Sequence, residues 1–214
     1  MLGATGLIGK AVTQELLAGG WDEVRVLVRA PLALNHPKLK QTSIDWDKLG
    51  QYKERFEGVY AVFCCLGTTI KTAGSQQQFE RVDLDYPLEA AGIAKACGVK
   101  QFLVVSSVGA NAKSRNFYTR TKGRVEEGLA AAGFHGLHIF RPSLLLGERA
   151  EYRLGERVGA VFMKALDFAM VGKLAQYRAI PGAKVAKAMV NIALADTGGM
   201  HIYPNEVIHV IGGR

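Results

Sequence analysis

Serine, tyrosine and lysine at short spacing give this sequence its clearest chemical signal. Ser106 and Ser107 follow an apolar run, and Tyr118 and Lys122 come next in a segment with helical periodicity. The spacing i, i+4 places Tyr118 and Lys122 on one face of a helix, one turn apart. A lysine ammonium beside a phenol stabilises the phenolate, and a nearby serine hydroxyl can hold a carbonyl oxygen. The set predicts an acid/base apparatus for hydride transfer, with either serine available to it.

A glycine-rich stretch near the start of the chain predicts a site for a phosphorylated ligand. Its sequence, Gly3-Ala-Thr-Gly6-Leu-Ile-Gly9, runs into an amphipathic segment. Gly3 and Gly6 permit a tight turn against a pyrophosphate, Gly9 permits close packing of the helix, and the helix N-terminus offers N–H groups to the anion. A nucleoside triphosphate loop is excluded, because Ala4 and Ala11 stand where that motif needs Gly and Ser or Thr. Taken alone, the motif also fits an ordinary turn.

Short apolar strand candidates alternate with helix-length segments along the chain. We predict strands over 24–28, 42–46, 59–66, 102–105 and 137–140, and helices over 7–18, 75–97 and 116–132. Ser75 and Asn116 are suitable helix N-caps, and Gly19, Gly98 and Gly133 suitable terminators. This alternation predicts an α/β fold, a doubly wound and mostly parallel sheet with helices on both faces.

We predict a single domain over residues 1–214, because no linker, repeat or low-complexity stretch divides the sequence. The alternation fades after Arg141-Pro142 and a helical run over 158–170 follows, so residues 142–185 are expected to form a small substrate lobe. The first strand is the exception, since only Met1 and Leu2 precede the glycine motif where a buried strand of about five residues is expected. The expectation is a sequence truncated within that strand.

The composition, 49% hydrophobic and 21% charged, is that of an ordinary globular protein and excludes a disordered chain. No apolar run reaches the ~18 residues of a membrane-spanning helix, and the start of the chain lacks a secretion signal. Cys64, Cys65 and Cys97 are too few and too poorly placed for an ordinary disulfide, so a cytoplasmic location is expected. His135 and His138 lack further ligands at metal spacing, which predicts no metal site.

The net charge of +8 comes from the second half of the chain. Residues 1–112 carry 12 Lys and Arg against 11 Asp and Glu, whereas residues 113–187 carry 14 against 6. This excess suits nucleic acid, an anionic membrane surface or an acidic ligand, and a solvated surface explains it equally well.

Two helical stripes lie between residues 148 and 170. The first is basic with acidic residues interleaved: Arg149, Arg153 and Arg157 among Glu148, Glu151 and Glu156. A salt-bridged surface is the favoured interpretation, and a border for an anionic substrate is the alternative. The second stripe is apolar, over residues 158–169, and predicts core packing or a homodimer contact rather than membrane attachment.

Together the motifs resemble the short-chain dehydrogenase/reductase superfamily. The matching pieces are GATGLIG at 3–9, LVVSSVGA at 103–110, YTRTK at 118–122 and FRPSLLLG at 140–147. FCCLGTTIKTAGS at 63–75 and RVDLDYPLEAA at 81–91 are similar to an atypical branch, the Tat-interacting-protein-like oxidoreductases and their bacterial relatives. The resemblance spans nearly the whole chain and implies a Rossmann fold that binds NAD(P).

The resemblance also implies roles for individual residues. Tyr118 is the expected proton donor, Lys122 its partner and ribose ligand, and Ser107, in preference to Ser106, the ligand of the carbonyl. At residues 65–69, Cys-Leu-Gly-Thr-Thr replaces the Asn-Asn-Ala-Gly stretch of the better-known enzymes beside the nicotinamide. The predicted cofactor-binding set comprises Gly3, Thr5, Gly6, Leu7, Ile8, Gly9, Arg29, Asp45, Leu66, Gly67, Thr68, Lys122 and Pro142.

Arg29 bears on the choice of nicotinamide cofactor. Enzymes that use NAD place a carboxylate after the second strand to bind the ribose 2′-OH. Here the strand over 24–28 is followed by Arg29, with no carboxylate before Asp45. An arginine suits a 2′-phosphate, so NADP(H) is the preferred cofactor and NAD(H) the alternative. The competing interpretation is that Arg29 is simply a solvated charge at the end of the strand. The resemblance places Asp45 at the adenine, and a helix N-cap is its competing role.

The leading hypothesis is a cytoplasmic NADP(H)-dependent oxidoreductase of a small carbonyl or enone. The second is a cofactor-bound redox sensor or regulator with little turnover. Epimerase or dehydratase chemistry on a nucleotide sugar is a further use of the same Ser-Tyr-Lys set. Nucleic-acid binding through the basic segment is disfavoured, because aromatic residues do not interleave with the basic ones.

Overall fold

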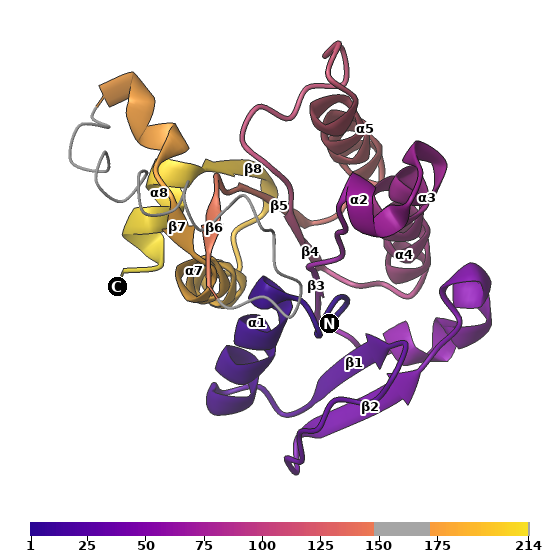
Figure 1. The fold of residues 1–214 in the computed structure, drawn as a ribbon. Helices are drawn as coiled ribbons and strands as arrows, with labels where there is room; N and C mark the ends of the chain where they lie inside the picture. The colour runs from indigo at the N-terminus through magenta and orange to yellow at the C-terminus, as the bar shows by residue number, and fades with distance from the viewer. Residues whose placement is uncertain (148–171, 214) are drawn as a thin grey trace.

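The strands form because their apolar runs can be buried on both faces of a parallel sheet. The computed structural model describes residues 1–147 and 172–213 (Figure 1). Its four-stranded parallel sheet has the order β3-β4-β5-β8, and a parallel pair, β1-β2, is joined to it through Leu2. The strands are β1 (Val24–Val28), β2 (Leu39–Ser43), β3 (Ala61–Cys64), β4 (Gln101–Val105), β5 (Gly136–Arg141) and β8 (Gly199–Pro204).

Leu2 alone occupies the place of the first strand. It forms parallel bridges to Leu27 of β1 and Cys64 of β3. Its N–H donates to the carbonyl of Phe63 (2.9 Å), and its own carbonyl accepts from the N–H of Cys65 (2.9 Å). These bridges give the order β2-β1-Leu2-β3-β4-β5-β8, so the glycine motif leaves the middle of the sheet directly.

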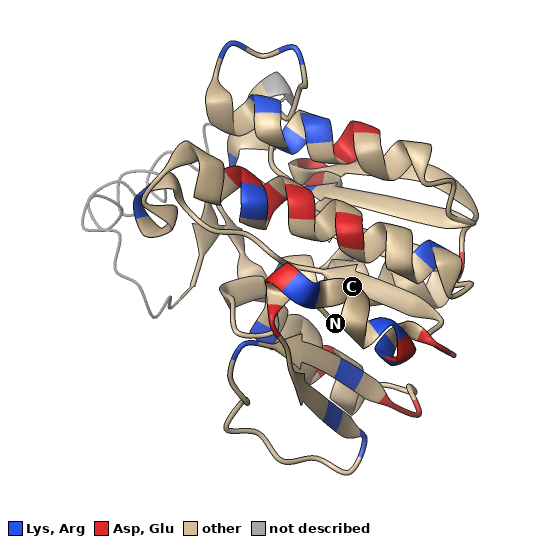
Figure 2. Cartoon of the chain, turned by 90° about the vertical axis from the view of Figure 1, so that its right-hand side faces the viewer, with Lys and Arg blue, Asp and Glu red and all other residues tan. Residues whose placement is uncertain are grey.

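The helices alternate with the strands and carry mixed charge. Figure 2 shows acidic and basic residues interleaved along the helices that cover one face. Among them, η1 and η3 are 3-10 helices and η2 is a π-helical turn. The bounds are α1 (Leu7–Ala18), η1 (Trp46–Phe56), α2 (Ile70–Ala73), α3 (Gln76–Glu80), η2 (Arg81–Asp85), α4 (Tyr86–Ala96), α5 (Phe117–Ala131), η3 (Gly172–Tyr177), α7 (Gly182–Ala195) and α8 (Asn205–Ile211).

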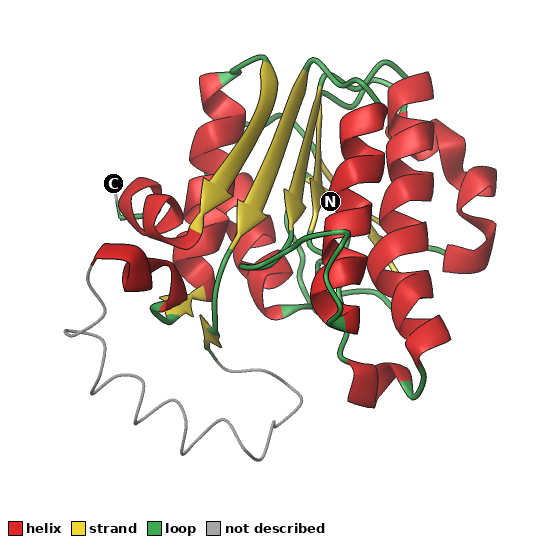
Figure 3. Ribbon diagram, turned by 90° about the horizontal axis from the view of Figure 1, so that it is seen from above, coloured by secondary structure: helices red, strands yellow, loops and turns green. Residues whose placement is uncertain are grey.

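Helices lie on both sides of the sheet (Figure 3). α1 and α7 pack together on one face, where Phe63 and Leu103 enter the core. α4 and α5 cover the other face, where the neighbouring residues Val62 and Phe102 are buried. Successive residues of one strand thus enter opposite cores, as the continuous apolar runs predict. The predicted α/β fold with a doubly wound parallel sheet is confirmed.

The predicted helix ends are confirmed as well. The side chains of Ser75 and Asn116 cap α3 and α5, each accepting from the backbone N–H three residues further on. Gly19 is the C-cap of α1. Gly98 and Gly133 follow α4 and α5 with φ of +76° and +67°, the left-handed conformation that favours glycine.

Four sequence predictions differ from the structure. The strand expected over 59–66 is shorter, at Ala61–Cys64. The strand expected over 42–46 lies earlier, at Leu39–Ser43, because Asp45 caps η1 and Trp46 begins it. The helix expected over 75–97 is interrupted by the π-helical turn η2. The alternation does not fade after Arg141-Pro142, since α7 leads to β8, which pairs in parallel with β5.

The segment between β5 and α7 is described in part. β6 (Leu145–Leu146) pairs in parallel with β7 (Ile180–Pro181). The helix predicted over 158–170, the basic stripe and the apolar stripe all lie outside the described residues.

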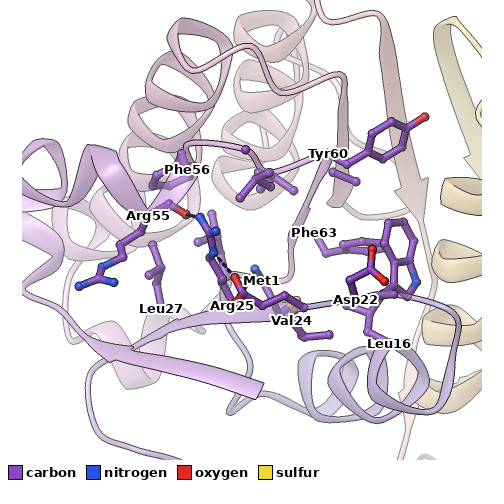
Figure 4. A pocket seen from close by; sticks show the side chains of 17 residues that line it. Met1, Leu16, Asp22, Val24, Arg25, Leu27, Arg55, Phe56, Tyr60 and Phe63 are labelled. Carbon is purple, nitrogen blue, oxygen red and sulfur yellow. Dashed lines mark hydrogen bonds and ion pairs between the residues drawn. The ribbon is translucent and has the colours of Figure 1, made fainter. Parts of the chain in front are cut away.

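A cavity of about 220 Å³ lies beside Met1, between the amino ends of β1 and β3 (Figure 4). On one side the guanidinium of Arg25 donates to the carbonyl of Glu57 (2.8 Å). On the other, the rings of Trp21 and Phe63 meet edge to face, with centroids 6.2 Å apart. Parallel sheets bind ligands at the carboxyl ends of their strands, so we place the candidate site at the opposite end from this cavity.

Candidate functional site

The glycine motif forms a tight turn that leads into α1. Gly3 has φ +79°, and a Cβ there would lie 2.5 Å from the carbonyl oxygen of Cys65. A Cβ at Gly9 would lie 1.9 Å from the carbonyl oxygen of Gly3. Both positions therefore require glycine, because backbone atoms fill the space of any side chain.

The start of α1 is arranged to hold an anion. Gly6 is its N-cap and supplies no side-chain hydrogen bond, so the first N–H groups of the helix are left for a ligand. A Cβ at Gly6 would meet only the Gly3 carbonyl oxygen, at 3.5 Å, and Thr5 and Gly6 are exposed. This open, uncapped turn fits the pyrophosphate of a dinucleotide.

The side chains of Leu7 and Ile8 face inward. Ile8 is 5% exposed and belongs to the core between α1 and α7. Leu7 lies against Gly147 and Gly182, where an added Cβ would come within 2.5 and 2.9 Å of its side chain. Of the predicted cofactor contacts, these two residues can offer their backbone to a ligand, while their side chains anchor α1.

Arg29 and Asp45 follow β1 and β2 at the carboxyl end of the sheet. Arg29 is exposed, and within residues 1–147 and 172–213 its guanidinium forms no hydrogen bond or ion pair. Asp45 is the N-cap of η1, accepting from the N–H of Asp47 (3.0 Å), and pairs with Lys48 at 3.5 Å. The N-cap role of Asp45 is confirmed, and its contact with adenine stays a prediction.

Tyr118 and Lys122 lie one turn apart on α5, as their spacing predicts. Tyr118 is 36% exposed, with its ring centroid 5.8 Å from that of Phe79. Lys122 is 5% exposed. Burial by itself lowers the pKa of Lys122, but the negative charge of Asp83 and the nearby Tyr118 raise it above its ordinary value. Lys122 is therefore a buried cation within electrostatic reach of the tyrosine.

Asp83, which sequence reasoning missed, holds Lys122. Its Oδ1 lies 2.7 Å from Nζ of Lys122, and the two side chains are 1% and 6% exposed. Its Oδ2 accepts the N–H of Thr68 at 2.8 Å. The available signal was a carboxylate between Val82 and Leu84 in an apolar helix pattern, since a buried carboxylate needs a partner.

The same carboxylate orders the loop that follows β3. Thr68 is half-buried and Gly67 is exposed, and a Cβ at Gly67 would lie 3.5 Å from Oδ1 of Asp83. Leu66 is half-buried and packs against the α4–α5 core. The structure thus brings the predicted loop residues to the buried lysine.

The two serines after β4 have different partners. Ser106 is 5% exposed and donates from Oγ to Oε1 of Glu126. Glu126 also accepts from Nε of Arg141 at 3.0 Å and pairs with its Nη2. The half-buried Ser107 donates to the carbonyl of Val108 at 3.2 Å. Glu126 lies one turn beyond Lys122 on the buried face of α5 and is a second neighbour of the candidate site that the sequence analysis missed.

Two backbone contacts hold the segment that connects β4 to α5. Pro142, which is buried, accepts the N–H of Val108 at 3.0 Å. Gly123 lies against the loop, where an added Cβ would be 2.0 Å from the nitrogen of Ala112. The predicted cofactor residue Pro142 thus supports the loop after Ser107 through its carbonyl.

The part of the chain that the structure describes shows neither a metal-binding cluster nor a membrane-spanning helix. Residues 1–147 and 172–213 contain no group of three or more His, Cys, Asp or Glu placed to bind a metal ion. His138 is fully buried, with Nδ1 3.1 Å from the hydroxyl of Tyr203. None of the helices in this part of the chain combines the length and apolar character needed to span a bilayer.

Comparisons with known proteins agree with this geometry. Residues 3–196 match the model of a family described as NAD(P)H-binding. The protein HTATIP2 of Rattus norvegicus is 36% identical over 217 residues, which cover 99% of this chain and 88% of that protein. The protein fmp52, mitochondrial, of Emericella nidulans is 35% identical over 173 residues, covering 78% of this chain and 74% of that one.

Solved structures share the fold. MoeE5 in complex with UDP-glucuronic acid and NAD aligns with a TM-score of 0.74 at 18% identity, covering 95% of this chain and 74% of that chain. The oxidoreductase ylbE of Lactococcus lactis aligns with a TM-score of 0.66 at 15% identity, covering 100% and 98%. Identities this low support the fold alone.

The fold and the glycine turn together define an NAD(P)-binding Rossmann domain. The chain belongs to the NAD(P)H-binding family, in the atypical branch of the short-chain dehydrogenase/reductase superfamily that includes HTATIP2. The resemblance drawn from the motifs is thereby confirmed. The family describes this chain, in general terms, as an oxidoreductase-like protein.

Proposed function

We propose that this protein is an NADP(H)-dependent oxidoreductase that reduces a small carbonyl compound. The observation that carries the proposal is the exposed Tyr118 one turn from the buried cation Lys122, within a family that binds NAD(P)H. The family supports an NAD(P)-binding, oxidoreductase-like protein. The substrate class, the preference for NADP(H) and the catalytic residues go beyond the family and are proposed here.

The residues divide the chemistry among them. A bound reduced nicotinamide supplies the hydride. Tyr118 donates its phenolic proton to the carbonyl oxygen, and the ammonium of Lys122 stabilises the phenolate that results. Ser107 donates a hydrogen bond to the same oxygen and so orients the substrate. Lys122 also binds the ribose hydroxyls with the N–H groups that Asp83 leaves free.

Cofactor binding is assigned to the turns at the carboxyl end of the sheet. Thr5, Gly6 and the N-terminus of α1 bind the pyrophosphate. Leu66, Gly67 and Thr68 line the nicotinamide side. Arg29 binds a 2′-phosphate, because its exposed guanidinium has no partner among the described residues and can form a bidentate pair.

The substrate lobe and the cellular location are further parts of the proposal. We assign residues 142–185 to the lobe of a single domain, since β6 and β7 pair just beyond the end of β5. The cytoplasmic location stays a prediction, and the Emericella nidulans relative carries "mitochondrial" in its name.

The first experiment is a fluorescence titration with NADPH and NADH, followed by NADPH oxidation with a panel of aldehydes, ketones and enones. Tyr118→Phe should keep the wild-type Kd for NADPH and lose turnover by about a hundredfold or more, the usual scale for an acid/base group. Tyr60→Phe is the matched control, a similarly exposed tyrosine (37%) at the opposite end of the sheet.

The outcomes separate the candidate functions. Tight NADPH binding without oxidation of NADPH by any carbonyl favours the redox sensor. Conversion of a nucleotide sugar with no net change in the nicotinamide favours an epimerase or dehydratase. Absence of binding to either nicotinamide contradicts the proposed function.

The choice of cofactor has its own test. Arg29→Glu should weaken NADPH binding by about tenfold or more, because it replaces a phosphate partner with a like charge, and should leave NADH binding within about twofold. Lys40→Glu makes the same change of charge at an exposed site on β2 and should alter neither Kd. Equal losses for NADPH and NADH would contradict the assignment of Arg29.

A further inference from the structure

Asp83 lies between two parts of the candidate site that are far apart in the sequence. One carboxylate oxygen is 2.7 Å from Nζ of Lys122 on α5, and the other accepts the N–H of Thr68, 2.8 Å away, in the loop after β3. The Asp83 side chain is 1% exposed, so water does not compete for either contact. A carboxylate shared in this way connects the lysine to the loop.

The π-helical turn η2 places Asp83 on the buried side. π-Helical turns insert an extra residue into a helix and occur often at functional sites. Within this turn Asp83 and Leu84 are buried, while Asp85 is exposed and lies 3.6 Å from Arg81. The turn thus carries two carboxylates, of which only Asp83 faces the site.

The negative charge of Asp83 also compensates the buried ammonium of Lys122. A buried ammonium needs a counter-charge, and removing one member of a buried pair leaves the other uncompensated. An ammonium has three N–H donors, so one can meet Asp83 while the others are directed to Tyr118 or to a ligand. Asp83 can therefore hold Lys122 without displacing its proposed ligands.

We propose that Asp83 is a positioning residue that couples Lys122 to the Thr68 loop, so that the ribose side and the nicotinamide side of the site are ordered together. This inference rests on the proposed function for the identity of the ligand. The coupling itself is a property of the chain and is present before any ligand binds.

Variants at both ends of the ion pair test the coupling, first at Asp83 and then at Lys122. Asp83→Asn retains a carbonyl oxygen for the N–H of Thr68 and removes the charge that Lys122 needs, whereas Asp83→Ala removes both. Asp85→Asn is the matched control, because it neutralises an exposed carboxylate in the same turn. The readouts are the Kd for NADPH as a function of pH, and amide hydrogen exchange at Thr68 without cofactor.

We expect Asp83→Asn to raise the Kd for NADPH by about tenfold or more at pH 7, because the buried ammonium of Lys122 loses its counter-charge. Affinity should also begin to fall at a lower pH than in the wild type, because Lys122 loses its proton more easily without Asp83. Asp85→Asn should reproduce the wild-type curve. If Asp83→Asn melts earlier but keeps the Kd and its pH dependence, Asp83 is only structural and the proposal is overturned.

Hydrogen exchange decides the coupling without a ligand. In Lys122→Met, exchange at the Thr68 amide should be about tenfold faster, because Asp83 loses the ion pair that fixes its second oxygen. Unchanged exchange at Thr68 overturns the coupling whether or not NADPH binds. If the wild type binds no nicotinamide while exchange at Thr68 rises as expected, the proposed function fails and the coupling stands.

Discussion

Two adjacent serines, Ser106 and Ser107, follow β4, and their side chains have different partners. Ser106 is committed to Glu126, which also holds Arg141, so its hydroxyl joins β4, α5 and β5. Ser107 donates to the carbonyl of its own neighbour, Val108, at 3.2 Å, a long bond that it can exchange for the oxygen of a substrate. We therefore expect Ser107, and not Ser106, to bind the carbonyl oxygen.

The two alanine variants should separate the roles of the serines. Ser106→Ala leaves the buried Glu126 short of one donor and should lower the free energy of unfolding by about 1–2 kcal/mol. Ser107→Ala should leave stability unchanged and reduce kcat by about tenfold or more, because one donor to the substrate oxygen is lost. Urea unfolding and steady-state kinetics measure the two effects. The opposite result, a stable Ser106→Ala with lost turnover, assigns the carbonyl to Ser106.

At this scale the sequence predicts residues that share one helix, and it does not predict their partners from other elements. Tyr118 and Lys122 were found because helical geometry alone brings them together. Asp83 and Glu126 were missed, because the residues that a buried carboxylate meets depend on tertiary packing. Their position on apolar helix faces was the signal that each requires a partner.

At the scale of elements, α1 is positioned by the close contact between Gly9 and Gly3. In Gly9→Ala the new methyl group would lie 1.9 Å from the carbonyl oxygen of Gly3, so the helix must move off the turn. We expect this variant to lose about 2–3 kcal/mol of stability, typical of overpacking. NADPH binding should fall with it, since the N–H groups of α1 would no longer face the pyrophosphate.

Gly92→Ala is the control for a glycine within a helix. Gly92 lies in α4, is exposed, and has no atom within 4 Å of an added Cβ. The variant should gain about 0.5–1 kcal/mol, the difference in helix propensity between Ala and Gly, and bind NADPH as the wild type does. Thermal unfolding and NADPH titration of both variants compare a glycine in close contact with neighbouring backbone, Gly9, with a solvent-exposed one, Gly92. A Gly9→Ala variant as stable as the wild type would contradict the packing argument.

Whether the sequence predicts an element correctly depends on how that element is buried. The bounds of α1 and β1 agree with the prediction, because their apolar positions are local and periodic. β2 was placed too late, since most of its residues are partly or fully exposed and lack an apolar run. β8 was missed for the same reason, as an edge strand that pairs only with β5 among the described strands. The position of an exposed strand is set by its hydrogen bonds to a neighbouring strand, and the hydrophobic pattern of the sequence does not reveal that pairing.

Across the whole molecule, the basic excess of residues 113–187 is partly neutralised by the fold. Lys122 pairs with Asp83, and Arg124 pairs with Glu80 at 2.5 Å. Figure 2 shows the resulting mixture of acidic and basic residues along the helices of one face. Acidic residues from the first half of the chain thus neutralise two of the basic residues that make up the excess of the second half. Nucleic-acid binding is not tested by this pairing, and the sequence prediction against it stays a prediction.

The pH dependence of global stability should depend on His138, which is 0% exposed in β5. Burial lowers the pKa of His138 to about 4, and the stacked His201, with its ring centroid 5.5 Å away, contributes to the lowering. As pH falls below about 6.5, His138 becomes protonated in the unfolded chain, whereas in the folded protein it stays neutral until about pH 4. The free energy of unfolding therefore decreases over this range. The loss should approach about 2–3 kcal/mol at pH 4 and vanish above about pH 7.

His138→Asn should remove this part of the acid destabilisation. The introduced amide is neutral at every pH, and it offers the hydroxyl of Tyr203 a polar partner near the former Nδ1 position. The variant is expected to be less stable at pH 7, because a buried ring is lost, and to have a flatter curve of unfolding free energy between about pH 4 and 6.5. Urea unfolding at several pH values measures both, and a slope unchanged in His138→Asn would assign the acid lability to carboxylates instead.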